Sequence, residues 1–224
     1  MDDTLVQLIA ANIAFVGTHF AMSHPLRAPL VGLFKEGGFS ALYSLVSAAT
    51  LFWIYMAYKA APAADLAGSG EIGWIIATAL TLPALVLLAG SFAGNPALAM
   101  PGAEDRARAE PKGVFKVTRH PMMWGFAIWA LSHIILWHNM RSVITALAMG
   151  VLALVGAKLQ DRKKAALMGE SWAAWSSRTS YWPKFGKMLS VGIGYWAVGL
   201  AAWLAISWAH LPLGGIPAGI WRWF

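Results

Sequence analysis

Histidine is the residue type that offers chemistry in unusual places along this chain. His19 and His133 each lie in an apolar run, with no fixed charge within three residues. An ionisable side chain inside a membrane span is a functional hypothesis by default, and neutral imidazole is the commonest metal ligand. The chain has no cysteine, which excludes disulfides, iron–sulfur clusters, covalent c-type haem and a thiol nucleophile. Two histidines on different helices are therefore a candidate axial pair for a b-type haem.

Two considerations leave alternatives open to this pair. A buried histidine often simply forms a hydrogen bond to a carbonyl oxygen, because buried polar groups generally find partners. Depth also matters, since at ~1.5 Å per residue His133 lies roughly 18 Å along its helix from Pro121. His19 lies near the side of the membrane where Pro121 starts its helix. Unless a helix tilts or starts deep, His120 matches the depth of His19 better than His133 does.

Two tryptophans accompany His133 at helical spacing. Trp129 and Trp137 precede and follow it by four residues, which places all three on one face of a helix. They form either an aromatic packing stripe or the wall of a site for a large planar cofactor or polyene. Periodicity alone favours packing.

Two short polar segments could contact an anionic group. Arg119 and His120 stand just before Pro121, where a helix should begin. Unpaired backbone N–H groups there could hold an anion together with Arg119, although a helix cap with a snorkelling arginine is commoner. Arg27 could anchor to lipid headgroups, which is the commoner role, or meet a haem propionate. We expect His138 in a solvated loop and His210 at the end of the last span.

Long apolar runs must position these side chains. Of 224 residues, 58% are hydrophobic and 12% are charged, about half the usual charged share, and the mean hydropathy is +0.58. This composition excludes a soluble, disordered or nucleic-acid-binding protein. A span needs ~20 apolar residues, and six runs approach that length: Thr4–Met22, Phe39–Tyr58, Ile72–Gly94, Pro121–Trp137, Ser142–Ala157 and Leu189–Ala209. We expect an all-α, polytopic bundle of about six transmembrane helices.

The basic residues predict how this bundle is oriented. The loops at 23–38, 95–120 and 158–188 hold 2, 5 and 7 Lys or Arg residues, and the other side holds Lys59, Arg141 and Arg222. The positive-inside rule then places those three loops in the cytoplasm and both termini on the non-cytoplasmic side. The first run lacks the positive start and cleavage site of a signal peptide. We expect one integral membrane domain over 1–224, with a cytoplasmic connector at 95–120 and an amphipathic cytoplasmic segment at 158–188.

Four segments resemble a known family. "THFAMSHPLR" (Thr18–Arg27), "FSALYSLVS" (Phe39–Ser47), "TRHPMMWGFAIWALSH" (Thr118–His133) and "DRKKAALMGESWAAWSSRTSYWPK" (Asp161–Lys184) are similar to the NnrU family of bacterial membrane proteins. The same pattern is shared with 15-cis-ζ-carotene isomerase, and the resemblance covers nearly the whole chain. It implies a multi-span protein of the bacterial inner membrane with a non-covalent haem b, and cis–trans isomerisation of a polyene double bond.

The resemblance also implies site residues. The family's haem ligands correspond to His19 and His133, with His24 as an alternative because the first segment differs in spacing by one residue. The isomerase has a further histidine before its third span, where this chain has Gly70-Glu71-Ile72-Gly73. NnrU relatives are associated with denitrification loci, which suggests a haem-carrying or assembly factor for a denitrification or respiratory complex as another role.

A second resemblance suggests different chemistry. The "RHPMMWG" block and the later Asp161 segment are similar to the isoprenylcysteine and phospholipid methyltransferases, which bind S-adenosylmethionine. That resemblance implies a site made of Arg119, His120, Asp161 and Arg178. Gln160-Asp161 replaces the paired glutamates of those enzymes, which argues against methyl transfer.

The sequence thus predicts a haem-dependent, redox-gated isomerase-like enzyme acting on an apolar isoprenoid or carotenoid-like substrate within the bilayer. The expected ligands and catalytic residues are His19 and His133. His120, Trp129 and Trp137 are expected around the cofactor, and Arg27 or Arg119 beside its propionates. Carotenoid biosynthesis or denitrification is the expected context, with respiratory or denitrification membrane proteins as candidate partners and no nucleic acid.

Overall fold

The chain folds into helices joined by short connections. A computed structural model describes residues 2–98 and 101–224, and within them no strand occurs. The long helices are α1 (Asp3–Ser23), α2 (Arg27–Ala60), α3 (Gly70–Gly90), α5 (Pro121–Leu136), α6 (Met140–Met168) and α8 (Ile193–Gly214). Shorter helices are α4 (Ala103–Arg108) and α7 (Glu170–Arg178), and 3-10 turns cover Gly113–Lys116, Phe185–Ser190 and Gly219–Arg222. The all-α prediction is confirmed for the described residues.

Five of these helices are long and apolar enough to cross a membrane: α1, α2, α3, α6 and α8. The expected fourth span is α5, which is apolar but has 16 residues, about 24 Å of helix against a hydrocarbon core of about 30 Å. The helix ends early because Trp137 adopts a left-handed conformation (φ 46°), and Asn139 then caps α6 by accepting a hydrogen bond from the backbone N–H of Ser142 (2.8 Å). An all-helical bundle with five candidate membrane-spanning helices is therefore confirmed for the described residues, whereas the span count of six stays a prediction.

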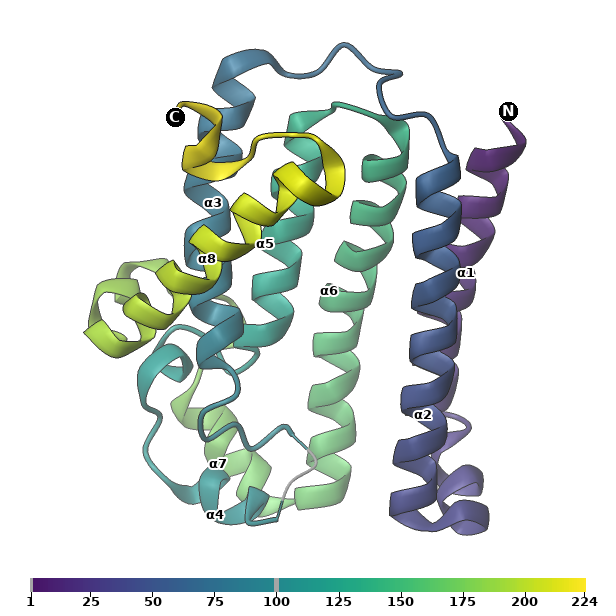
Figure 1. Ribbon diagram of the computed structural model, residues 1–224. Coiled ribbons are helices and arrows are strands. Elements are labelled where there is room, and N and C mark those ends of the chain that lie inside the picture. Colours follow the sequence, from purple (N-terminus) through teal and green to yellow (C-terminus); the bar gives the residue numbers. More distant parts are fainter. Residues whose placement is uncertain (1, 99–100) are drawn as a thin grey trace.

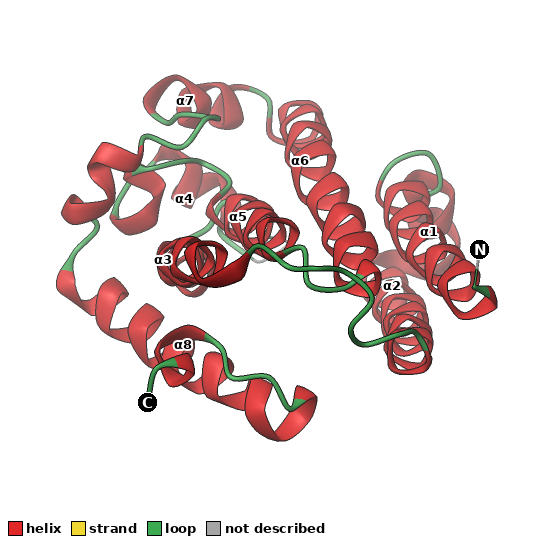
Figure 2. Ribbon diagram, turned by 90° about the horizontal axis from the view of Figure 1, so that it is seen from above, coloured by secondary structure: helices red, strands yellow, loops and turns green. Residues whose placement is uncertain are grey.

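The long helices form two groups. Helices α1, α2 and α6 share one apolar core, and α3, α5 and α8 share another with α4 and α7. Contacts between α5 and α6 join the groups, and seen along the bundle axis α8, α3, α5, α6 and the α1–α2 pair follow one another in a curved row (Figure 2). Glycines let α3 approach its neighbours, since a Cβ at Gly125 would lie 2.8 Å from the Ala84 oxygen and one at Gly199 would lie 2.7 Å from Val86 Cα. Small residues commonly make such close helix contacts in membranes.

The two ends of the bundle differ in character. Both termini lie at one end, and α4 and α7 lie at the other (Figure 1). Residues 158–188 form no single amphipathic helix: α6 continues to Met168, Gly169 breaks it with φ 51° and ψ −121°, and α7 follows. The connector at 95–120 likewise contains α4 and a 3-10 turn. The positive-inside rule predicts that the α4–α7 end faces the cytoplasm.

Candidate functional site

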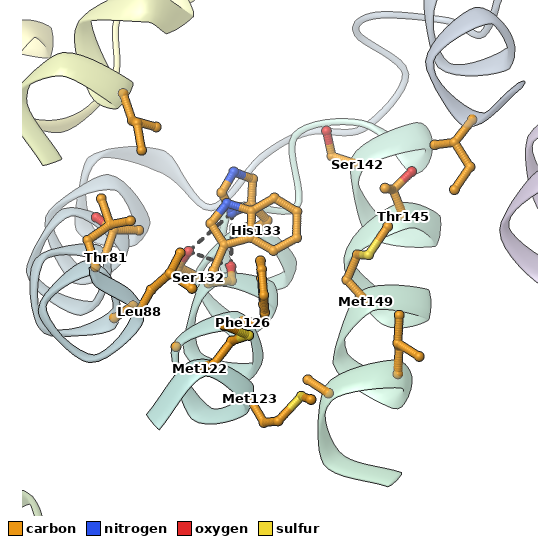
Figure 3. Close-up of a pocket in the computed structure, with 18 of the residues that line it drawn as sticks. Thr81, Leu88, Met122, Met123, Phe126, Ser132, His133, Ser142, Thr145 and Met149 are labelled. Atoms are coloured by element: carbon orange, nitrogen blue, oxygen red, sulfur yellow. Dashed lines mark hydrogen bonds between the residues drawn. The ribbon is translucent and has the colours of Figure 1, made fainter. Parts of the chain in front are cut away.

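A single large cavity collects most of the histidines. It has a volume of about 900 Å³ and is lined by residues from all six long helices, within the usual range of small-molecule sites. Methionine and aromatic side chains such as Met122, Phe126 and Met149 form much of its wall (Figure 3). Of the six histidines, all of which the structure describes, five line it: His19, His24, His133, His138 and His210.

Three of these histidines share one hydrogen-bonding pattern. The ring Nδ1 lies near the carbonyl oxygen four residues earlier: 2.7 Å in His19, 2.9 Å in His133 and 2.8 Å in His210. A carbonyl oxygen only accepts, so Nδ1 carries the hydrogen and Nε2 keeps a lone pair. Metal-binding histidines are usually oriented in this way, by donating the other ring N–H to a carbonyl or carboxylate. The carbonyl bond expected of a histidine in the protein interior is thus present in all three. Within the described residues it leaves Nε2 without a hydrogen-bond partner in His133 and His210 but not in His19, where Nε2 lies 3.3 Å from the Ser47 hydroxyl.

His133 has a neighbouring histidine that the sequence did not single out. Its ring centre lies 6.4 Å from that of His210, with the ring planes 33° apart. The two residues come from α5 and α8, which are distant from each other in the chain. His210 lies in the last turn of α8, near the end of the last span as expected, and its carbonyl oxygen accepts a hydrogen bond from the backbone N–H of Gly215. His138 lies in the loop between α5 and α6, as expected, and it also lines the cavity.

His19 lines the same cavity at another depth. It stands 16 residues into α1, about 24 Å from the end where α1 begins, whereas His133 stands three residues, about 5 Å, from the end of α5. Those helix ends lie at the same end of the bundle (Figure 1). The ring of His19 packs against Phe15 and Tyr43, and its Nε2 lies 3.3 Å from the Ser47 hydroxyl. The structure therefore places the expected ligand pair in one cavity without bringing the two rings together.

The two tryptophans predicted beside His133 have different positions. Trp129 lines the cavity, and its ring centre lies 4.4 Å from that of His133. Trp137 follows the end of α5, is 45% exposed and is not among the cavity-lining residues that the structure describes. The expectation of one shared helical face fails for Trp137 because the helix stops one residue before it.

The end of the cavity nearest α4 and α7 carries polar groups. Both ring nitrogens of His24 are buried without a hydrogen-bond partner within the described residues. Lys163 of α6 also lines the cavity there, as does Gln160. The sequence pattern favoured a solvated basic face for this stretch. Helical spacing along α6 could have identified Lys163, because it belongs to one face of that helix. The residues of this face that line the cavity are Thr145, Met149, Leu152, Gly156, Gln160 and Lys163.

The arginines expected beside a cofactor have other partners. Arg27 forms an ion pair with Glu36 (3.0 Å), lies over the ring of Phe39, and is not among the described cavity-lining residues. Arg119 makes a two-point ion pair with Asp161, at 2.9 and 2.6 Å. Neither guanidinium is aimed into the cavity.

His120 belongs to the same cluster as Arg119. Its side chain is fully buried, Nε2 lies 2.8 Å from Oδ1 of Asp161, and Nδ1 lies 3.2 Å from Oε1 of Gln160. Asp161 thus receives hydrogen bonds from two cationic or polar partners. We call Arg119, His120 and Asp161 the ion cluster. His120 is not among the described cavity-lining residues, and Gln160 stands between it and the cavity.

The segment after α7 holds the ion cluster in place. Thr118 Oγ1 donates to the carbonyls of Ser180 and Tyr181, and the Arg119 backbone N–H donates to Ser180 at 2.8 Å. The Tyr181 ring lies 5.6 Å from that of His120 and below the Arg119 guanidinium. Burial, and then the charge of Asp161, raise the pKa of the Tyr181 hydroxyl. These contacts fix the start of α5, which carries Arg119 and His120, against the segment that follows α7.

Arg178, the fourth residue of the methyltransferase-like set, lies apart from the ion cluster. Its guanidinium donates to the carbonyl oxygens of Ala107 (2.6 Å), Arg108 (3.0 Å) and Ala109 (3.1 Å) and pairs with Glu110. Arg178 therefore caps the end of α4. The polar groups expected to hold S-adenosylmethionine are engaged with one another or with the backbone, so this geometry lends no support to methyl transfer.

A bare metal ion finds few ligands in the part of the chain that the structure describes. No group of three or more His, Cys, Asp or Glu side chains is placed to bind one. A metal at the His133–His210 pair would need its remaining ligands from a cofactor.

Comparison with known proteins gives two matches. The family model described as "NnrU protein" matches residues 7–218. The chloroplastic 15-cis-zeta-carotene isomerase of Zea mays is 38% identical over 73 residues, which span 32% of this chain and 19% of the maize protein. No solved structure matches the chain.

Proposed function

Because this chain belongs to the NnrU family, which the match over residues 7–218 shows, we propose that it is a membrane isomerase-like enzyme. Its substrate is an apolar polyene or isoprenoid that lies in the histidine-lined cavity, and the reaction is cis–trans rotation about a double bond. The named activity of the maize relative supports this reaction class. The observation that carries the proposal is the cavity itself, which combines apolar walls with histidines whose Nε2 atoms are available.

We infer that the cofactor of this cavity is haem b. Two imidazoles are too few for a bare ion, whereas a porphyrin brings four nitrogens of its own and needs only axial ligands. Without cysteine the haem is held non-covalently. When bound, haem b would supply a redox-active iron to the cavity.

His133 and His210 are the two histidines that would hold the haem. Their ring centres lie 6.4 Å apart, and iron–imidazole bonds are about 2 Å long, so both rings could reach one iron. We infer His133 and His210 as the ligand pair, and the pair predicted from the sequence, His19 and His133, stays a prediction. The Trp129 ring against His133 limits how that imidazole can rotate.

The remaining wall residues bind and orient the substrate. Rotation about a carbon–carbon double bond needs neither a nucleophile nor a general base, so apolar walls suffice for most of the contact. Phe126, Met122 and Met149 offer aromatic and polarisable surface to an extended polyene, and they exclude water from the reacting bond.

An absorption spectrum of the detergent-purified protein, with and without dithionite, tests the cofactor. We expect a Soret band with sharp reduced α and β bands, lost in His133→Ala and His210→Ala. His138→Ala is the matched control, since His138 also lines the cavity but lies outside the pair. Loss in His19→Ala with retention in His210→Ala would favour His19 and His133 as the axial pair. A colourless preparation that takes up no added haem would refute the cofactor.

The cellular setting follows from the same proposal. The protein resides in the bacterial inner membrane as a multi-pass protein, with the bilayer as its surroundings and as the route by which an apolar substrate arrives. Respiratory or denitrification membrane proteins are its candidate partners, because of the family association.

A further inference from the structure

One end of the cavity holds a cation without a counter-charge. Lys163 lines the cavity, and in residues 2–98 and 101–224 no Asp or Glu lines it and no ion pair involves Lys163. Arg27 and Lys164 lie close enough to repel its charge. A half-buried ammonium among like charges is costly unless an anion completes the site.

His24 adds unmet hydrogen-bonding capacity at this end. Both of its ring nitrogens are shielded from solvent, and neither has a partner within the described residues. Such atoms are rare in folded proteins, and a bound ion or water often satisfies them. The imidazole offers a donor to an anionic oxygen, as does the Lys163 ammonium.

The rest of the cavity is long and apolar. Thr145 and Lys163 both line it from α6, and 18 residues of helix separate them by about 27 Å. Between them the lining includes Met149, Leu152 and Phe20. The shape and polarity suit an extended molecule with one anionic end.

We propose that the cavity binds an amphiphile whose phosphate-bearing head contacts Lys163 and His24 and whose apolar tail extends toward His133. We call Lys163 and His24 the head site. The idea that the tail is the reacting polyene rests on the proposed function, whereas the head site does not depend on it. A phosphate head could belong to an isoprenoid phosphate or to an anionic phospholipid, which share this chemistry.

Binding measurements on the full chain test the head site. The protein is placed in phosphatidylcholine nanodiscs and titrated with labelled geranylgeranyl diphosphate, then with geranylgeraniol, which has the same tail and no phosphate. We expect the diphosphate to bind at least tenfold more tightly. Competition by phosphatidic acid at a comparable concentration would identify a phospholipid as the natural source, and failure to compete would identify the isoprenoid phosphate.

Variants connect this preference to the named residues. Lys163→Gln should abolish the preference for the diphosphate, Lys163→Arg should retain most of it, and His24→Ala should reduce it several-fold. Lys158→Gln is the matched control, because Lys158 is an exposed lysine of the same helix outside the cavity. Circular dichroism and size-exclusion profiles verify that each variant folds.

The two proposals fail separately. Equal affinity for alcohol and diphosphate in the wild type, or a preference that survives Lys163→Gln, would overturn the head site. A colourless protein that still prefers the diphosphate would refute the haem cofactor and keep the head site. We expect Lys163→Gln to leave the haem spectrum unchanged, because Lys163 lies far from His133 and His210.

Discussion

The ion cluster and the His133–His210 pair both contain histidines that form hydrogen bonds within the fold, but His120 is fully buried whereas His133 and His210 are partly exposed. In the ion cluster each ring nitrogen of His120 faces a side-chain oxygen, of Asp161 or of Gln160. In the pair, each ring gives one nitrogen to its own helix and leaves the other to the cavity. A polar group that is fully paired inside the protein contributes to structure, whereas one that is half paired is available to a ligand.

The largest expected effect tests the structural role of the ion cluster. Asp161→Ala leaves the guanidinium of Arg119 and the imidazole of His120 without their shared partner, and both side chains are largely buried. We expect a loss of about 3 kcal/mol in the free energy of unfolding, as for other broken buried ion pairs. Denaturant titration in detergent measures it. A change below about 1 kcal/mol would mean that the cluster stabilises little.

Arg178→Ala should have the next largest effect. It removes the hydrogen bonds that hold three carbonyls at the end of α4, at a cost of about 2 kcal/mol. Because the loss is local, hydrogen exchange should accelerate in residues 103–110 and stay unchanged in α1. Uniform acceleration through the bundle would contradict the capping role.

His133→Ala and His210→Ala should cost less stability in the haem-free protein. Each removes one hydrogen bond to a carbonyl of its own helix, worth about 1 kcal/mol, and each enlarges a cavity that already exists. Thermal unfolding of the haem-free variants, compared with Asp161→Ala, measures this contrast. If all three variants lost the same stability, the ion cluster would not be more important for folding than the His133–His210 pair.

The smallest effect concerns pH. The pKa of Tyr181 is raised in the folded protein above its usual value of 10.0, so the folded state favours the neutral phenol. Its contribution is present in full below pH 10 and is lost as pH rises through the folded pKa. We expect Tyr181→Phe to flatten the decline in stability above about pH 10, measured by thermal unfolding across pH. An unchanged decline would show that the lysines dominate it.

Much of the fold follows from local sequence pattern. Apolar runs located all six long helices, and Pro121 marked the start of α5. The end of α5 was predicted to within one residue, since the apolar run ends at Trp137 and the helix at Leu136; the left-handed conformation of Trp137 was not predicted, because tryptophan rarely adopts positive φ. The break at Gly169 is compatible with its positive φ, but a glycine alone does not show whether a helix ends or continues through it.

The candidate site was harder to predict because it depends on packing between distant segments. His133 stood out through its apolar surroundings, but its neighbour His210 depends on how α8 crosses α3, where Gly199 lies directly against Val86. His19, the partner predicted for His133, lies at another depth in the bundle. The rise per residue of the two helices had already indicated this difference. Lys163 lies in a stretch whose many basic residues predicted a solvated surface. The composition of the stretch does not reveal that one face of α6 lines the cavity.

Gln160 lies between the ion cluster and the cavity. It lines the cavity, and its Oε1 lies 3.2 Å from the buried ring of His120. A molecule that enters the cavity at this end can therefore contact Gln160, which in turn contacts His120 of the ion cluster. The ring of His120 should therefore respond to ligand binding in the cavity, although it does not line it. We expect the ¹⁵N chemical shifts of the His120 imidazole to change when the cavity is occupied.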